Sequence, residues 1–277
     1  MTSVPSPKAI PHALREELLA VAHRVADAAG KAALPHFRRV GLAAENKAGE
    51  TGFDPVTIAD RQTERAMRDI LAALRPDDGI LGEEEAARPG TTGLTWVIDP
   101  IDGTRSFLSG MPVWGVLVAV DAGDGPVLGV IDQPYTGERF TGGFGQAQFR
   151  RRGEAPVEIR TRPCADLSAA TLFTTFPEVG TPDERAGFAA VAARVRLTRY
   201  GADCYAYALL AAGQIDLVIE AGLQPYDVQG PQAVIEGAGG VVTDWQGRPA
   251  HRGGRVLAAG DARVHAQALE ILSRMPG

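Results

Sequence analysis

The chain has 277 residues, of which 45% are hydrophobic and 22% charged, as is ordinary for a soluble globular protein. This length suffices for one large domain or two packed subdomains. The net charge of −6 argues against a nucleic-acid-binding protein, which needs a basic surface. No apolar run approaches a membrane span, and residues 1–11 contain prolines and lack the apolar core of a signal peptide. We therefore expect a cytoplasmic protein without nucleic-acid or membrane partners.

The two cysteines, Cys164 and Cys204, belong to no metal-binding or redox spacing, so reduced thiols are predicted. A cysteine-dependent phosphatase would need an arginine six residues after its nucleophile. Neither cysteine has one, which removes that class of enzyme.

The N-terminal region is predicted to contain a flexible tail over 1–12 and then a long amphipathic helix. Apolar residues recur at helical spacing from 13 to about 37, and the helix should be interrupted near Gly30 or ended by Pro35. The polar, glycine-containing segment 41–53 predicts a mobile loop or the turn of a hairpin.

A second amphipathic helix is expected over 61–71, with Asp60 at its N-cap position, a structural role that competes with any chemical one. A short strand over 79–82 should then open into Glu83-Glu84-Glu85, although a run of glutamates is usually a solvated face.

Strands dominate the middle of the chain, and strands alternate with helices in its second half. The later strands are expected near 96–98, 113–120, 127–131, 139–142, 171–175, 197–200, 217–220, 239–244 and 256–259. The later helices are expected over 182–194, 204–212, from after Asp227 to about 236, and over 265–275. A change to Gly, Gln and Arg around 142–153 predicts the boundary between an N-terminal α+β subdomain, 13–145, and a C-terminal α/β subdomain, 146–277.

One hexapeptide, Asp99-Pro100-Ile101-Asp102-Gly103-Thr104, concentrates the candidate chemistry. The β-branched run before it predicts a buried strand, which Pro100 should end because proline cannot donate to a β-ladder. Asp99 and Asp102 then share a tight turn, where their carboxylates repel unless a cation such as Mg²⁺ lies between them. Gly103 and Thr104 should open a short helix whose free amides face an anion such as phosphate. Taken alone, the stretch also fits an ordinary strand, turn and Asx-type cap.

The order of several motifs decides between these interpretations: Asp60, Gly82-Glu83-Glu84, the hexapeptide and Tyr226-Asp227. In this order they resemble the inositol monophosphatase family of Mg²⁺-dependent, lithium-sensitive phosphatases, from about residue 13 to the end. The resemblance implies an α/β (α+β) fold, a layered α/β/α/β sandwich with the metals between its two halves. It also implies a homodimer that acts on a small-molecule phosphate monoester.

Residue roles follow from the same resemblance. Glu83, Asp99 and the carbonyl of Ile101 would hold a first Mg²⁺, with Mn²⁺ as a substitute. Asp99, Asp102 and Asp227 would hold a second, and Glu83 would reach a weaker third. With Glu83, Thr104 and Asp60 form the catalytic set, in which Thr104 orients and deprotonates the attacking water. The amides of Gly103 and Thr104 would bind the phosphate, and no covalent phospho-enzyme forms.

The sequence departs from the family pattern at two places. Tyr226 stands where the family usually has tryptophan, beside the ligand Asp227. Pro231 follows, and we expect it in the first turn of a helix, where its missing N–H costs little.

The implied substrate-binding residues are Asp102, Asp203, Glu220 and Asp227. Asp203 and Glu220 suit a cationic alcohol better than a polyol, because a buried acid needs a partner. Phrases such as Gly222-Leu223-Gln224-Pro225-Tyr226-Asp227 resemble the histidinol-phosphatase branch. Hydrolysis of L-histidinol phosphate in histidine biosynthesis is therefore the predicted reaction.

Four alternatives stay open from the sequence. Two are other reactions, those of an inositol-1-monophosphatase and of a 3′,5′-bisphosphate nucleotidase. A third, from a different class, is a metal-binding regulatory protein without catalysis. The fourth concerns Asp203 alone, which could be the N-cap of the 204–212 helix.

Overall fold

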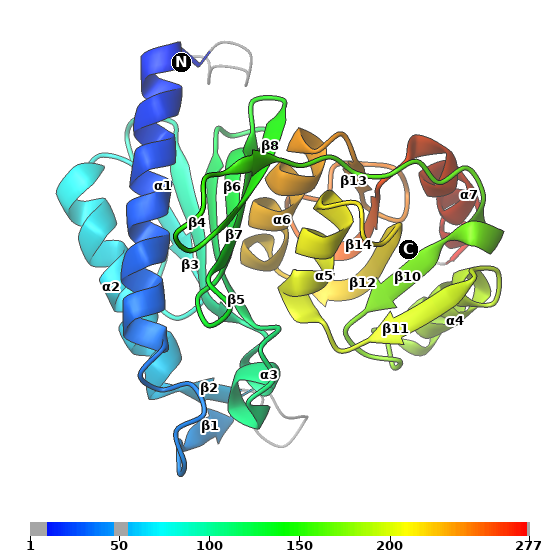
Figure 1. Ribbon diagram of the computed structural model, residues 1–277, viewed down its shortest axis with the longest axis horizontal. Coiled ribbons are helices and arrows are strands. Elements are labelled where there is room, and N and C mark those ends of the chain that lie inside the picture. The colour runs from blue at the N-terminus through cyan, green and yellow to red at the C-terminus, as the bar shows by residue number, and fades with distance from the viewer. Residues whose placement is uncertain (1–9, 47–54, 276–277) are drawn as a thin grey trace.

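Two β-sheets with helices on both sides form the computed structural model, which describes residues 10–46 and 55–275 (Figure 1). The helices are α1 (His12–Ala33), α2 (Ile58–Leu74), α3 (Thr104–Ser109), α4 (Pro182–Ala192), α5 (Asp203–Ala211), α6 (Pro225–Gly237) and α7 (Ala262–Leu272). Helices α1 and α2 cover one face of the first sheet, and α5 and α6 lie between the two sheets. The layered sandwich is thus confirmed, and α4 and α7 add an outer layer against the second sheet.

The first sheet has seven strands in chain order, and the second has five in the order β11-β10-β12-β14-β13. The first contains β3 (Gly79–Gly82), β4 (Thr95–Asp102), β5 (Gly115–Asp121), β6 (Pro126–Gln133), β7 (Glu138–Gly143), β8 (Gln146–Arg151) and β9 (Val157–Glu158). The second contains β10 (Thr171–Thr174), β11 (Leu197–Tyr200), β12 (Leu217–Leu223), β13 (Val241–Thr243) and β14 (Gly254–Ala259). Only β3 and β4 run parallel in the first sheet, so the predicted antiparallel meander over β5, β6 and β7 is confirmed.

The first sheet continues beyond the predicted subdomain boundary. Strand β8 pairs with β7 along its whole length, and β9 pairs with β8. The chain therefore leaves the first sheet after Glu158, not at 145/146. The Gly- and Arg-rich composition of 142–153 marks a hairpin, since Gly143 and Gly145 both adopt positive φ there.

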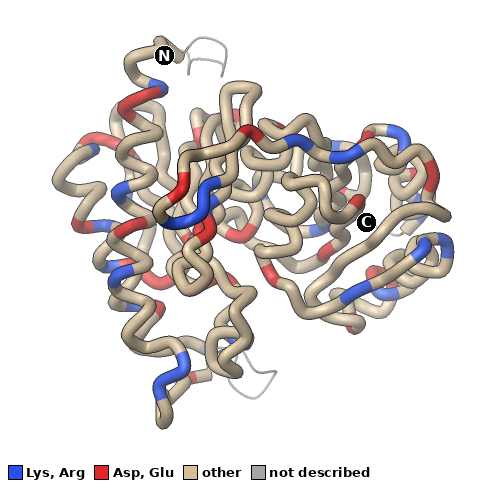
Figure 2. Tube along the Cα trace, in the orientation of Figure 1, with Lys and Arg blue, Asp and Glu red and all other residues tan. Residues whose placement is uncertain are grey.

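Helix α1 packs by the predicted apolar stripe, and Leu18, Val25 and Ala29 are fully buried. It ends before Pro35 and passes through Gly30, which lies against Pro134 in the turn after β6. Figure 2 shows acidic and basic residues interspersed along this helix. Of the predicted tail, residues 1–9 lie outside the described part, whereas Ile10 is buried and the helix begins at His12.

The segment 41–53 is described only in part. Strand β1 (Ala44–Asn46) pairs antiparallel with β2 (Pro55–Thr57), as the hairpin interpretation predicts. The connecting residues 47–54 lie outside the described part of the chain. Among the helices that are described, none has the length and apolar character needed to cross a bilayer.

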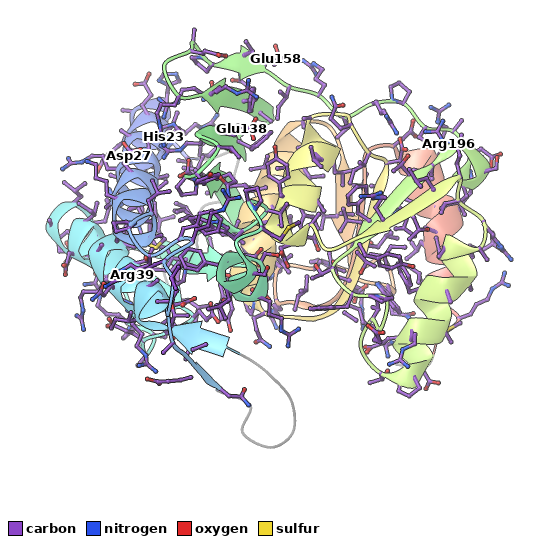
Figure 3. The ribbon with its side chains drawn as sticks, turned by 60° about the horizontal axis from the view of Figure 1, so that its bottom comes forward. His23, Asp27, Arg39, Glu138, Glu158 and Arg196 are labelled. Atoms are coloured by element: carbon purple, nitrogen blue, oxygen red, sulfur yellow. The ribbon has the colours of Figure 1, made fainter. Side chains whose placement is uncertain are left out.

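An ion pair and a hydrogen bond attach helices α1 and α5 to the first sheet. On β7, Arg139 donates to Asp132 at 2.6 Å and to Asp27 of α1 at 2.8 Å. Its neighbour Glu138 accepts a 2.6 Å bond from the Tyr205 hydroxyl of α5. Figure 3 shows His23 and Asp27 of α1 beside the strands that carry Glu138. These contacts fix α5, whose first residue is Asp203, relative to the sheet.

Helix α6 approaches the first sheet closely because the sheet presents glycines to it. A methyl group on Gly129 would lie 2.2 Å from the carbonyl oxygen of Gly230, and one on Gly142 would lie 2.3 Å from the Cα of Val234. Side chains at these positions would force the helix away from the sheet. The sequence thus lets the first turn of α6 reach the end of β4.

Candidate active site

Three carboxylates converge where β4 ends and α6 begins. Oxygens of Asp99, Asp102 and Asp227 all lie within 4.8 Å of one another. They line a cavity of about 470 Å³ that also contains Glu83, Asp203 and Glu220 among its lining residues. The predicted acidic residues from both halves of the chain therefore meet in one place.

A local irregularity of β4 presents the two aspartates. The prediction that the strand stops at Pro100 is wrong. The strand continues to Asp102, and its pairing with β5 shifts between Asp99 and Asp102. Such a bulge tolerates proline because a residue there needs no ladder hydrogen bond. The turned backbone lets the amide of Ile101 donate to Asp99 Oδ1 at 3.0 Å. The aspartate is thereby held toward the cavity.

Asp227 lies in the first turn of α6, not before the helix as predicted. Its Oδ2 accepts a 2.7 Å bond from the amide of Gln224, which closes a capping box. Because α6 begins at Pro225, Pro231 lies inside the helix and not in its first turn. Proline there removes the amide that would bond to the carbonyl of residue 227 four positions earlier.

Without a cation between them, the carboxylates of this cluster repel one another. Burial and then the charges of Glu83, Asp102 and Asp227 raise the pKa of Asp99 well above its ordinary value. Burial, followed by Asp203 and Asp227, also raises the pKa of Asp102. A divalent cation would relieve this repulsion, and hard oxygen ligands in this arrangement suit Mg²⁺ or Mn²⁺. The residues present therefore fit a metal site.

Asp60 and Thr104 form the second part of the site. Both the amide and the hydroxyl of Thr57 donate to Asp60 Oδ2, at 2.8 and 2.7 Å. Thr57 is the N-cap of α2, and Asp60, predicted as the N-cap, is the third helical residue of a capping box. This leaves Asp60 Oδ1 to face the Thr104 hydroxyl at 3.3 Å. The same hydroxyl lies 3.2 Å from the carbonyl oxygen of Ile101.

Gly103 brings the turn after Asp102 close to Asp203 of the other half of the molecule. It adopts a left-handed φ of 79° as the N-cap of α3, and a methyl group there would lie 2.8 Å from the carboxylate of Asp203. Ser106 of α3 donates to the same carboxylate at 2.5 Å, and the Cys204 amide donates to Asp102 at 2.7 Å. Asp203 is the first residue of α5, at φ 43°, and the cap position belongs to Ala202. The N-cap alternative for Asp203 is therefore wrong.

Glu220 on β12 is buried in the cavity wall. Its carboxylate accepts bonds from the Thr175 amide at 2.6 Å, the Thr175 hydroxyl at 2.9 Å and the Thr174 hydroxyl at 3.0 Å. Burial raises its pKa to about 7, against the lowering effect of these donors. Within the described residues no cation forms an ion pair with Glu220, so its charge is compensated only by neutral groups.

Three cavity residues, Tyr207, Phe176 and Arg105, were given no part in the site from the sequence. Tyr207 is buried, and its hydroxyl has no hydrogen-bond partner among the described residues. The half-exposed ring of Phe176 lies 4.8 Å below the guanidinium of Arg105, so the pair joins the two halves at the cavity wall. A tyrosine or phenylalanine in an apolar stretch is typical of core packing, so the sequence assigned these rings no chemistry. The two cysteines are buried and free, as predicted.

Comparison with known proteins identifies the family. The model of the inositol monophosphatase family matches residues 14–275. The chain belongs to the inositol monophosphatase family. It is a phosphatase of a metal-dependent family, in agreement with the acidic cluster of the cavity.

The similarity to three relatives extends over most of this chain. The chloroplastic bifunctional phosphatase IMPL2 of Arabidopsis thaliana is 40% identical, over 96% of this chain and 78% of its own length. A histidinol-phosphatase of Chlorobaculum parvum is 35% identical, over 83% of this chain and 86% of that protein. A solved inositol monophosphatase from Zymomonas mobilis superposes with a TM-score of 0.81 and 41% identity, covering 93% of this chain and 98% of that one.

Proposed function

We propose that the protein is a Mg²⁺-dependent phosphomonoesterase that hydrolyses L-histidinol phosphate to L-histidinol and phosphate in histidine biosynthesis. Relatives named histidinol-phosphatase support the substrate, and relatives named inositol-1-monophosphatase make inositol 1-phosphate the alternative. The observation that carries the proposal is the pair of carboxylates, Asp203 and Glu220, on the wall of the cavity. The homodimer and the cytoplasmic location stay predictions.

The buried charge of Glu220 favours a cationic alcohol. Its hydrogen-bond partners are two threonines, and Asp203 is bonded to a serine hydroxyl. A carboxylate removed from water gains most from a cationic partner. Histidinol phosphate carries an ammonium group and an imidazole, whereas the hydroxyls of an inositol are neutral. The unpaired Tyr207 hydroxyl adds a neutral hydrogen-bonding group to the same wall.

Glu83, Asp99, Asp102, Asp227 and the carbonyl of Ile101 would hold two to three Mg²⁺ ions, with Mn²⁺ as a substitute. When bound, these ions supply Lewis-acid chemistry that neutralises phosphate charge and makes a water more acidic. The protein contributes the fixed positions of the carboxylates, which the β4 bulge and the α6 capping box hold.

Thr104 and Asp60 would position the attacking water. When the Thr104 hydroxyl donates to Asp60 Oδ1, its oxygen can accept a proton from that water while its own proton passes to the Asp60 carboxylate. Asp60 is held by Thr57 on its other oxygen, so it cannot turn away. Gly103 and Thr104 line the same cavity, and their amides would hold the phosphate as negative charge develops. Water attacks the phosphorus directly, and no side chain forms a covalent intermediate.

The test is phosphate release from L-histidinol phosphate, inositol 1-phosphate and adenosine 3′,5′-bisphosphate, each with Mg²⁺ and with a chelator. We expect kcat/KM for histidinol phosphate to exceed the others by at least about tenfold, the value of one charge-assisted hydrogen bond. A preference for inositol 1-phosphate would overturn the substrate and keep the phosphatase. Metal-independent release would overturn the mechanism.

Removing the charge of Asp203 should change substrate preference. Asp203→Asn keeps a residue that tolerates positive φ, and it keeps an acceptor for Ser106. We expect kcat/KM for histidinol phosphate to fall by about 10- to 100-fold, and that for inositol 1-phosphate to change much less. Ser106→Ala is the matched control, because it removes the hydrogen bond and leaves the charge. Equal losses on both substrates would remove Asp203 from the specificity argument.

Glu220 should make the stability of the metal-free protein depend on pH. Its folded pKa of about 7 lies above the unfolded value of 4.5, so the folded state binds the proton more tightly. Stability is then highest below the unfolded pKa and falls as pH rises through the folded pKa, by up to about 3 kcal/mol. Glu220→Gln should therefore raise Tm relative to the native protein at pH 8 by more than at pH 5. Thermal unfolding with a chelator at both values measures this, and a pH-independent difference between the two proteins would contradict it.

A further inference from the structure

Helix α2 carries a stripe of buried charged residues that points at the active site. Asp60, Glu64 and Arg68 follow one another at four-residue intervals, which places them on one helical face. Their exposed fractions are 1%, 0% and 9%. Burying three charged side chains on one helix is costly unless each has partners. Asp60 accepts a hydrogen bond from Thr104, whereas Glu64 and Arg68 have other partners.

Their partners belong to the loop that contains Glu83. Glu64 accepts bonds from the amides of Glu84 at 2.7 Å and Glu85 at 3.0 Å. Arg68 donates to Glu64 Oε1 at 2.8 Å and to the carbonyl oxygen of Glu85 at 2.9 Å. The buried pair therefore binds the backbone immediately after Glu83 on both its donor and its acceptor sides.

The strand before the loop leaves room for this contact. A methyl group on Gly82 would lie 2.3 Å from Glu64 Oε1 and 2.9 Å from a terminal nitrogen of Arg68. Any larger residue would push the carboxylate from the loop amides. Glycine is needed at this position because a side chain would collide with Glu64, and not because of its backbone φ.

We propose that Glu64, held by Arg68, is a positioning residue that fixes Glu83 toward the acidic cluster. Glu83 lines the cavity, and among neighbouring charges its effect on the pKa of Asp99 is the largest. The loop is an acidic segment, Glu83-Glu84-Glu85, and the acidic cluster adds three further carboxylates. Electrostatic repulsion between these groups therefore favours movement of the loop away from the cluster. The amide bonds to Glu64 oppose that repulsion without using the Glu83 side chain. One helix thus positions both Thr104, through Asp60, and Glu83, through Glu64. This inference rests on the proposed role of Glu83 as a metal ligand.

Glu64→Gln tests the proposal at constant size. The new amide group would face backbone N–H donors or Arg68, so at least one hydrogen bond is lost. We expect the apparent Kd of the weakest Mn²⁺ site, measured by paramagnetic resonance of free Mn²⁺ without substrate, to rise about 10- to 100-fold. Hydrogen exchange at the amides of residues 84 and 85 in the metal-free protein should rise at least about tenfold. Gly82→Ala should give the same two changes from the loop side.

Two reference variants separate the outcomes. Asp78→Asn removes another buried carboxylate, immediately before β3, that accepts from Arg75 at 2.7 Å and Trp96 at 2.9 Å. It should lower Tm and leave Mn²⁺ binding within about twofold of the native protein. Glu83→Gln reports whether Glu83 binds metal at all, and unchanged binding there would overturn the ligand role and this inference with it. Weakened binding in Glu83→Gln, together with native Mn²⁺ binding and native exchange in Glu64→Gln, would overturn the positioning role alone.

Discussion

Replacing Asp99 with asparagine is expected to abolish phosphate release and to make the metal-free protein more stable. Asparagine keeps the acceptor for the Ile101 amide and removes a buried charge repelled by four neighbouring carboxylates. Loss of the bound metal removes several kcal/mol of transition-state stabilisation, so kcat should fall by about 10³-fold or more. Steady-state phosphate release with Mg²⁺ and thermal unfolding with a chelator measure the two effects.

The matched control is Asp216→Asn. Asp216 is as buried as Asp99, but it accepts from Arg162 at 2.7 Å and from the Thr171 amide at 2.7 Å, and it does not line the cavity. Its substitution should lower Tm and leave the Mg²⁺ dependence of phosphate release unchanged. An Asp99→Asn protein with native activity would show that Asp99 holds no essential metal.

The second large effect is expected at Thr104. Thr104→Val keeps the branched shape and removes the hydroxyl that bonds to Asp60. Without a group to accept the proton of the water, kcat should fall by about 10²- to 10⁴-fold, while KM and Mn²⁺ affinity change little. Initial rates over a range of substrate concentrations measure kcat and KM separately.

Thr104→Ser is its control, because serine restores the hydroxyl at the start of α3 and should recover most of the activity. A valine protein as active as the native one would exclude Thr104 from the reaction. Weakened Mn²⁺ binding in the valine protein would instead show that the residue supports the metal site.

The acidic part of the site could be predicted because its signals are local. A β-branched run that ends in Asp99 and Asp102 specifies both the strand and the turned backbone. The prediction that Pro100 stops the strand was wrong because a bulge in the pairing of β4 with β5 accommodates it. In both cases proline avoids donating to the ladder, and the sequence does not tell the two apart.

The capping of helices was less predictable, because several residues compete for each cap. Thr57 and Asp60 are both good N-cap residues, and the capping box uses them together. A cap for α5 was the alternative interpretation of Asp203, but its carboxylate accepts from Ser106 of α3, which lies far away in the sequence. Such long-range contacts have no periodicity from which they could be predicted.

Glu64 shows the same limit at a buried position. The four-residue spacing of Asp60, Glu64 and Arg68 is visible in the sequence, where it is typical of a solvated helix face. Only the tertiary structure shows that this face is buried against the loop that contains Glu83. Cavity residues such as Tyr207 and Phe176 were missed for a related reason, since their roles depend on which apolar face remains open.

Crystals grown with Mn²⁺ and measured near its absorption edge would test most directly whether the acidic cluster is a metal site. Two or three anomalous peaks are expected within the cavity, in contact with oxygens of Glu83, Asp99, Asp102 and Asp227. The Asp99→Asn protein should lose at least one of them. A cavity without an anomalous peak, at a Mn²⁺ concentration that supports full phosphate release, would contradict the assignment of these carboxylates as the catalytic metal site.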